Sequence, residues 1–207
     1  MSELQFVVDV PEEHAYLIPL VFSGSQVSSL IRDLNSIVLS LLYSDERFIP
    51  RVNKLTIGLK HFKGVAFTSG SAVMLSSEYF DHIYTQSKAN LASFQSELHG
   101  VLVHELVHVW QSNGQNTLES GVIEGIADYV RLKAGLVPSH WKQIKTGKWN
   151  AGYNATGYFL DFVQNQAKIP FVQQLNETMW NQPWDPSIIE KMTGKSVEVW
   201  WDLYQKS

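Results

Sequence analysis

The 207-residue sequence contains no cysteine, which excludes disulfide bonds, thiolate metal ligands and a cysteine nucleophile. It also has no apolar run of about 18 residues, the length needed to cross a membrane. Residues 1–10 alternate like a strand and lack the basic start and long apolar core of a signal peptide. Charged residues make up only 17%, and no segment is repetitive or of low complexity. We therefore expect a folded chain rather than a disordered one.

Aromatic side chains are abundant, with 7 Trp, 8 Tyr and 10 Phe, and 44% of all residues are hydrophobic. This composition is ample for a packed core, and the length fits one domain. We expect a single domain, 1–207, with an N-terminal lobe (about 1–113) and a helical C-terminal lobe (about 114–207). The net charge of −4 argues against a nucleic-acid partner, and no feature specifies an oligomeric state.

The pentapeptide His104-Glu105-Leu106-Val107-His108 is an HExxH motif inside a run with helical character, 97–110. Residues four apart on a helix lie roughly 40° apart around the axis and about 6 Å apart along it, so both imidazoles can bind one Zn²⁺. Glu105 points about 100° away from His104, where it can reach a water on the ion and act as general base. The alternative is two ordinary core histidines, but burying two histidines and a glutamate without partners in an apolar helix is costly.

A second helix is expected after the possible capping box 116–119, and it carries Glu124 and Asp128 on one face. Glu124 lies 16 residues beyond His108 (124 − 108), which leaves room for a turn and a helix that folds back. Two histidines and one carboxylate leave a fourth position for water, the arrangement of a catalytic zinc site. Asp128 is then suited to hold the outer nitrogen of His104. The alternative is a carboxylate pair stabilised by the helix dipole.

These residues carry a resemblance to known families. HELVH followed by Glu124-Gly125-Ile126-Ala127-Asp128 is similar to the HExxH…ExxxD signature of gluzincin, thermolysin-like metallopeptidases. The stretches 104–111, 121–135 and 152–162 resemble the plant basic secretory protein family, described as zinc peptidases of plants, fungi and bacteria. The resemblance implies a zincin-like fold, Zn²⁺ as cofactor and hydrolysis of a peptide or protein substrate. This chain departs from the family name because it is not basic and shows no secretory signal.

The coarse pattern predicts an α+β fold, with a small N-terminal sheet followed mainly by helices. Period-two alternation predicts strands over 4–10, 54–59, 64–68 and 71–77. Helical spacing predicts helices over 25–43, 97–110, 155–167, 170–180 and 186–204, in addition to the helix of Glu124. In the first helix, Val27, Leu30, Ile31, Leu34, Ile37, Val38 and Leu41 are expected to face inward.

The resemblance to zincins also implies an edge strand beside the cleft that pairs with an extended substrate. The strand 71–77 is the candidate, with Ser71, Ala72 and Val73 contacting the substrate backbone, unless it is an ordinary sheet strand. Tyr153 is the candidate for stabilising the oxyanion because it follows Gly152 in a matched segment, with Tyr158 and His140 as alternatives to it.

Three functions remain open at this point. The first is a zinc peptidase, which uses Glu105 as base. The second is a zincin-fold binding or defence protein with a non-catalytic zinc, which does not need Glu105. The third is a zinc hydrolase of a non-peptide substrate such as a phosphodiester. The last would use a segment without Asp or Glu, 129–160, whose basic residues are Arg131, Lys133, Lys142, Lys145 and Lys148; such a run is more often a solvated face. The expected location is intracellular if Met1 is the native start and secreted if the sequence is a mature form.

Overall fold

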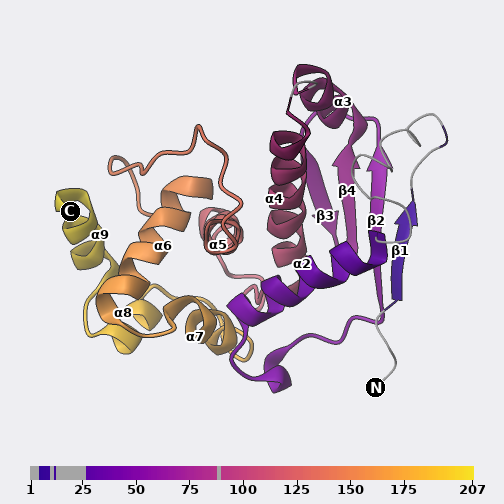
Figure 1. Cartoon of the computed structure of the whole chain (residues 1–207). Helices are drawn as coiled ribbons and strands as arrows, with labels where there is room; N and C mark the ends of the chain where they lie inside the picture. The colour runs from indigo at the N-terminus through magenta and orange to yellow at the C-terminus, as the bar shows by residue number, and fades with distance from the viewer. Residues whose placement is uncertain (1–4, 10–11, 13–26, 88–89) are drawn as a thin grey trace.

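The computed structural model describes residues 5–9, 12, 27–87 and 90–207. Four strands form one mixed sheet in the order β1-β2-β4-β3 (Figure 1). They are β1 (Gln5–Asp9), β2 (Lys54–Lys60), β3 (Ala66–Ser69) and β4 (Ala72–Ser76). β1, β2 and β4 run parallel, and β3 runs antiparallel to β4. The described strands lie close to their predicted ranges, although residues 4 and 10 of the first predicted strand lie outside the described residues.

The sheet order corrects the prediction about the edge strand. β3 and β4 form a hairpin in which Ser69 pairs with Ala72, and Gly70 takes a left-handed φ of 58° at its turn. β4 then pairs with β2 on its other side, so β4 is an inner strand and β3 is the edge. The prediction that 71–77 is the edge strand is therefore wrong. Alternation of side chains predicts both strands but carries no information on which of them lies outermost.

Most of the remaining chain is helical, which together with the sheet confirms the α+β class. The described helices are α2 (Val27–Leu42), the short 3₁₀ helix η3 (Glu46–Phe48), α3 (Ser77–Gln86), α4 (Leu91–Trp110), α5 (Ser120–Lys133), α6 (Tyr153–Ala167), α7 (Phe171–Thr178), α8 (Ser187–Thr193) and α9 (Val197–Lys206). None of the helices in the described part of the chain is long and apolar enough to cross a membrane. The division into two lobes near residue 113 stays a prediction.

Four helical features differ from the sequence-based expectation. α3 follows β4 directly and was not predicted. α5 begins at Ser120, and the predicted capping box 116–119 does not form, because the side-chain oxygen of Asn116 accepts from the side-chain amide of Asn113 instead. The predicted helix 186–204 is two helices that meet at Gly194, which ends α8. In α2, Ile37 is 38% exposed and does not face the core as expected.

α4 stands between the sheet and the C-terminal helices, as Figure 1 shows. Its apolar residues are buried nearly all the way round, including Val101, Leu102, Val103, Leu106 and Val107. A helix that is apolar on every side is stable only when other elements cover it. α4 packs on β3 and β4 on one side and on α2 and α5 on others, so the HExxH motif has a rigid scaffold.

Candidate metal centre

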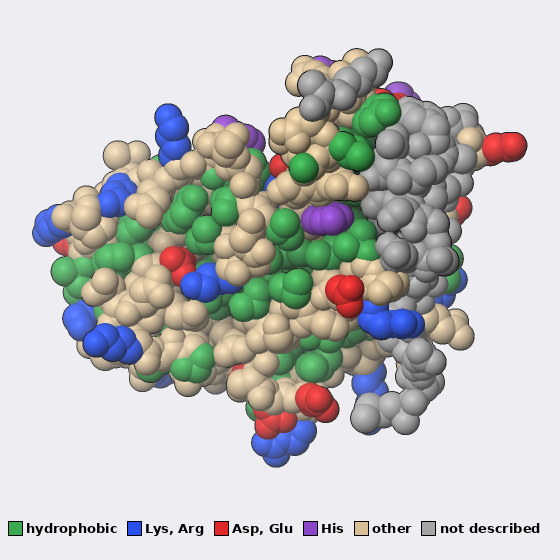
Figure 2. All heavy atoms as spheres, viewed as in Figure 1, with side chains coloured by type: hydrophobic (Ala, Val, Ile, Leu, Met, Phe, Trp, Pro, Cys, Tyr) green, Lys and Arg blue, Asp and Glu red, His purple; other side chains and the backbone are tan. Residues whose placement is uncertain are grey.

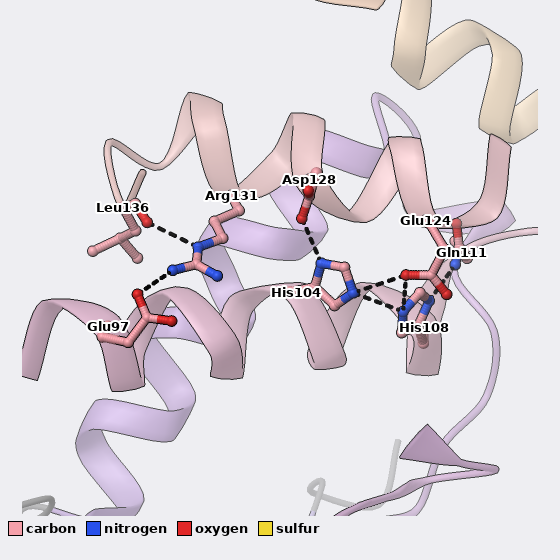
Figure 3. Close-up of polar contacts among 8 residues, drawn as sticks. All are labelled: Glu97, His104, His108, Gln111, Glu124, Asp128, Arg131 and Leu136. Atoms are coloured by element: carbon pink, nitrogen blue, oxygen red, sulfur yellow. Dashed lines mark hydrogen bonds and ion pairs between the residues drawn. The ribbon is translucent and has the colours of Figure 1, made fainter. Parts of the chain in front are cut away.

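His104 and His108 lie on the face of α4 that is turned toward α5, and Glu124 projects from α5 toward both of them (Figure 3). Nε2 of His104 is 3.2 Å from Nε2 of His108 and 3.1 Å from Oε2 of Glu124. Nε2 of His108 is 3.7 Å from the same carboxylate oxygen. The helical spacing of four residues brings the two imidazoles together, and the antiparallel return of α5 brings the third donor.

The three donor atoms fit a single metal ion. They all lie within 4.8 Å of one another. Ligand atoms held tetrahedrally at about 2.0–2.1 Å from one ion are about 3.3 Å apart, and the observed separations of 3.1, 3.2 and 3.7 Å bracket that value. The residues His104, His108 and Glu124 are therefore compatible with a bound metal.

The short distances between these side chains also shift their pKa values when no ion is present. Burial lowers the pKa of His104, but hydrogen bonds with Asp128 and Glu124 outweigh this effect and raise the pKa to about 9. Burial raises the pKa of Glu124, but hydrogen bonds from His104 and His108 outweigh it and lower the pKa to about 2. In the metal-free protein at neutral pH, His104 is thus protonated, and its positive charge lies between the carboxylates of Asp128 and Glu124.

Asp128 contacts the outer nitrogen of His104, as the sequence predicted. Its Oδ1 lies 2.7 Å from Nδ1 of His104, and only 3% of the Asp128 side chain is exposed. An imidazole that binds a metal through Nε2 carries its hydrogen on Nδ1 and needs an acceptor there. The contact is in place, and its role in orienting a metal ligand stays a prediction.

Gln111 contacts the outer nitrogen of His108 and was not singled out from the sequence. Its Nε2 lies 2.7 Å from Nδ1 of His108. Gln111 is the first residue beyond α4, and its side chain folds back over the last helical turn. The separation of three residues that allows this contact is visible in the sequence, so the signal was present there.

Glu105 is 6% exposed and contacts the edge strand. The Thr68 hydroxyl lies 2.7 Å from Oε2 of Glu105 and 3.0 Å from the Glu105 carbonyl oxygen. No local pattern in the sequence links these two residues, because they are 37 positions apart and the hairpin of β3 brings them together. Thr68 is the second residue at this site that sequence reasoning missed.

Tyr153 lies beside the proposed ligands. Its ring is stacked on that of His104, with centroids 6.2 Å apart and planes within 9° of parallel. The residue is 58% exposed, and the negative charge of Glu124, followed by partial burial, raises the pKa of its hydroxyl. Tyr153 therefore keeps its proton at neutral pH and is able to donate a hydrogen bond in the cleft.

The backbone that presents Tyr153 is unusual. Tyr153 has φ of 46°, an uncommon value for a bulky residue. Gly152 before it has φ of 96°, and its amide donates to the Thr156 hydroxyl at 2.9 Å. A side chain at Gly121 of α5 would collide with the Asn150 carbonyl, so the absence of one lets this turn lie directly on α5.

One continuous cavity of about 840 Å³ joins these residues. Its walls come from β3, α4, α5 and the segment before α6, and include Val65, Ala66, Phe67, Thr68, Val101, His104, Glu105, His108, Gln111, Glu124, Trp141 and Tyr153. His140 lines the cavity, whereas Tyr158 does not line it and packs on Trp141. Ser71, Ala72 and Val73 are also absent from its walls, so the edge-strand residues that meet the cavity are those of β3.

Three of the basic residues of 129–160 contact other residues of the chain. Arg131 is buried and binds Glu97 at 2.8 Å, away from the three proposed metal ligands (Figure 3). Lys133 pairs with Asp161 at 2.9 Å, and Lys145 contacts the carbonyl oxygen of Ser207. On the face drawn in Figure 2, lysines and arginines lie at several separate places. The partners of Arg131 and Lys133 leave little net field for steering an anionic substrate.

Comparison with known proteins gives one family. The family model described as peptidase of plants and bacteria matches residues 15–204. Comparisons with curated proteins and with solved structures gave no significant match.

Proposed function

Because the chain belongs to the family of peptidases of plants and bacteria, we propose that it is a zinc-dependent metallopeptidase with Glu105 as general base. Membership of the family implies a peptide or protein substrate. The observation that carries the proposal is the convergence of His104, His108 and Glu124 beside a buried carboxylate. A site that only stabilises the fold would fill all four metal positions with protein ligands.

The donor set favours Zn²⁺ among the common metals. Two imidazoles and one carboxylate are typical of catalytic zinc, whereas Mg²⁺ and Ca²⁺ prefer oxygen ligands alone. His104 and His108 would bind through Nε2 and Glu124 through Oε2, the atoms that already face one another. When bound, the ion would supply a Lewis acid that lowers the pKa of a water and polarises the scissile carbonyl.

Glu105 would move the proton in this reaction. It lies one residue from His104 and lines the same cavity. It would accept a proton from the attacking water and return it to the leaving amine. Thr68 holds Oε2 of this carboxylate, which leaves Oε1 for the water. The hydroxyl of Thr68 thereby limits the rotation of Glu105.

Tyr153 would stabilise the negative charge that develops on the carbonyl oxygen. Its position over His104, its exposure to the cavity and its retained proton support this role. His140 also lines the cavity, whereas Tyr158 lies outside the cavity walls. Tyr153 remains the stronger candidate of the three.

An extended substrate would lie along β3. β3 is the edge strand next to α4, and its residues 66–68 line the cavity. An edge strand offers unpaired backbone groups that can pair with a peptide. Phe67 of β3 is 44% exposed and Val65, just before β3, is 39% exposed, so this edge also presents apolar side chains at the rim. The substrate-binding role predicted for Ser71, Ala72 and Val73 belongs instead to this strand.

The proposal is tested by cleavage of a broad library of quenched peptides. The protein is assayed as purified, after removal of metal by a chelator, and after addition of one equivalent of Zn²⁺. We expect turnover that is lost with the metal and restored by Zn²⁺. Zinc binding without cleavage of any peptide would favour the binding protein or the non-peptide hydrolase instead.

A further inference from the structure

We propose that Gln111 is a positioning residue of the metal centre, whose side-chain amide fixes the ring of His108 and thereby strengthens zinc binding. The inference rests on the proposed function only in requiring that zinc binds at His104, His108 and Glu124. Figure 3 shows the side chain of Gln111 reaching the ring of His108 at the opposite end of the site from Asp128. The two histidines thus have different partners, a carboxylate for His104 and a neutral amide for His108.

The chemistry of the imidazole explains what the amide must do. A neutral histidine that binds zinc through Nε2 carries its hydrogen on Nδ1, and this hydrogen needs an acceptor. In the structure the amide nitrogen of Gln111 lies 2.7 Å from Nδ1, and Oε1 is buried without a hydrogen-bond partner among the described residues. This arrangement suits a His108 whose Nδ1 is unprotonated.

Zinc binding therefore requires the side-chain amide of Gln111 to rotate by half a turn. Half a turn about the last side-chain bond exchanges Nε2 and Oε1 with almost no change in shape. Oε1 then accepts the hydrogen of Nδ1, and the free lone pair of Nε2 on His108 faces the ion. The change is confined to one terminal rotation of this side chain.

The backbone before Gln111 is held by α2. The indole nitrogen of Trp110 donates to Oδ1 of Asn35 at 2.7 Å, and both residues are buried. The hydroxyl of Tyr43 donates to the carbonyl oxygen of Trp110. The last residue of α4 is thus attached to α2 through its side chain, and to Tyr43, the residue after α2, through its carbonyl group.

The backbone after Gln111 is held by α7. The amide of Ser112 donates to Oδ1 of Asn176 at 2.8 Å, and the Asn176 amide group donates to the Leu42 carbonyl at 3.2 Å. Asn176 is fully buried. Because both neighbours of Gln111 are fixed by buried hydrogen bonds, its side chain is presented to His108 at little further cost in entropy.

A carboxylate at this position would keep the hydrogen-bond acceptor for His108. Glu105, Glu124 and Asp128 already place three carboxylates around the two histidines. A fourth carboxylate beside His108 would accept the same hydrogen but would add negative charge. Replacement of Gln111 by Glu should therefore keep or strengthen zinc binding, whereas loss of the acceptor should weaken it.

The test measures zinc affinity by competition with a chromophoric chelator, using the full chain. Gln111→Met keeps the length of the side chain but removes the acceptor, and Gln111→Glu keeps an acceptor. Gln205→Met is the matched control because Gln205 is an exposed residue of α9 away from the site. We expect Gln111→Met to bind zinc about 10–100-fold more weakly than wild type, and Gln111→Glu and Gln205→Met to bind at least as well as wild type.

Wild-type affinity in Gln111→Met, or an equal loss in Gln111→Glu, would overturn the proposal. A second measurement needs no variant: in zinc-loaded wild type, long-range ¹H–¹⁵N spectra should show a hydrogen on Nδ1 of His108 that exchanges slowly with solvent. Absence of that hydrogen would also overturn it. Wild type that binds no zinc would refute this inference and the proposed function together, whereas wild type that binds zinc but cleaves no peptide would refute the peptidase alone.

Discussion

The Thr68 hydroxyl lies 2.7 Å from Oε2 of Glu105, so the edge strand of the sheet contacts the carboxylate that we assign as the general base. The strand that would bind substrate and the residue that would move the proton are therefore joined by one hydrogen bond. Strand β3 reaches this position because the hairpin at Gly70 places it next to α4.

Removal of the Thr68 hydroxyl should slow the chemical step. A hydrogen bond to a charged group is worth about 1.5–3 kcal/mol, which corresponds to roughly 10–100-fold in rate. Thr68→Val keeps the shape of the side chain, so we expect kcat to fall by about this factor while KM changes little. Steady-state kinetics at matched zinc content measure both quantities. Thr68→Ser restores the hydroxyl and should recover most of kcat; a Ser variant as slow as the Val variant would show that packing, and not the hydrogen bond, matters.

Tyr153→Phe should lower kcat without loss of zinc. Removal of one donor to an oxyanion costs about 10²–10³-fold in kcat in comparable sites. The ring would still stack on His104, so zinc content and thermal stability should stay close to wild type. Tyr158→Phe serves as the control, since Tyr158 lies outside the cavity walls. Full kcat in Tyr153→Phe would remove this residue from the mechanism.

The metal-free protein should lose stability as the pH rises from 6.5 to 9. The folded-state pKa of His104 is about 9, above the unfolded value of 6.5, because hydrogen bonds with Asp128 and Glu124 outweigh the effect of burial. The proton on His104 therefore stabilises the folded state fully below pH 6.5, and this contribution of about 3 kcal/mol disappears as the pH passes through 9. Thermal unfolding in the presence of a chelator measures the loss. His104→Gln should unfold with little change over the same range, and an equally steep dependence in that variant would assign the effect to another group.

Asn176→Leu should destabilise the fold. The Leu side chain leaves the Ser112 amide and the Leu42 carbonyl without their buried partner, and each unpaired group costs about 1–3 kcal/mol. Urea unfolding should therefore show a loss of about 2–5 kcal/mol. Asn165→Leu is the control, because its amide contacts Asp161 at an exposed position. A loss below 1 kcal/mol at Asn176 would mean that water or neighbouring groups replace its hydrogen bonds.

The parts of the site that depend on helix geometry could be predicted from the sequence. His104 and His108 are four residues apart on α4, and Glu124 and Asp128 are four apart on α5, so each pair shares a helix face. The contact of Asp128 with His104 followed from that spacing. Only the packing of α5 against α4 had to be assumed, and a short loop between two helices makes that arrangement the simplest one.

The parts that depend on sheet order and on loops could not be predicted in the same way. Strands 66–69 and 72–76 have similar patterns, and their order in the sheet is set by pairing with β2, which lies outside any local window. Thr68 was missed for the same reason. The expected capping box does not form because Asn116 bonds to the side chain of Asn113, while the Glu119 carboxylate accepts from the distant residues Asn150 and Trp184. Gln111 was visible at three residues from His108, but a glutamine there is typical of many exposed helix ends.

The most direct test of the account is the turnover of Glu105→Gln at one zinc per chain, compared with wild type on the same peptide. The substitution keeps the size of the side chain and removes its ability to accept the proton. We predict that zinc binding and folding stay close to wild type while kcat falls by about 10²–10⁴-fold, the usual contribution of a positioned base. Wild-type turnover in a zinc-loaded Glu105→Gln protein would contradict the assignment of Glu105 and, with it, the proposed mechanism.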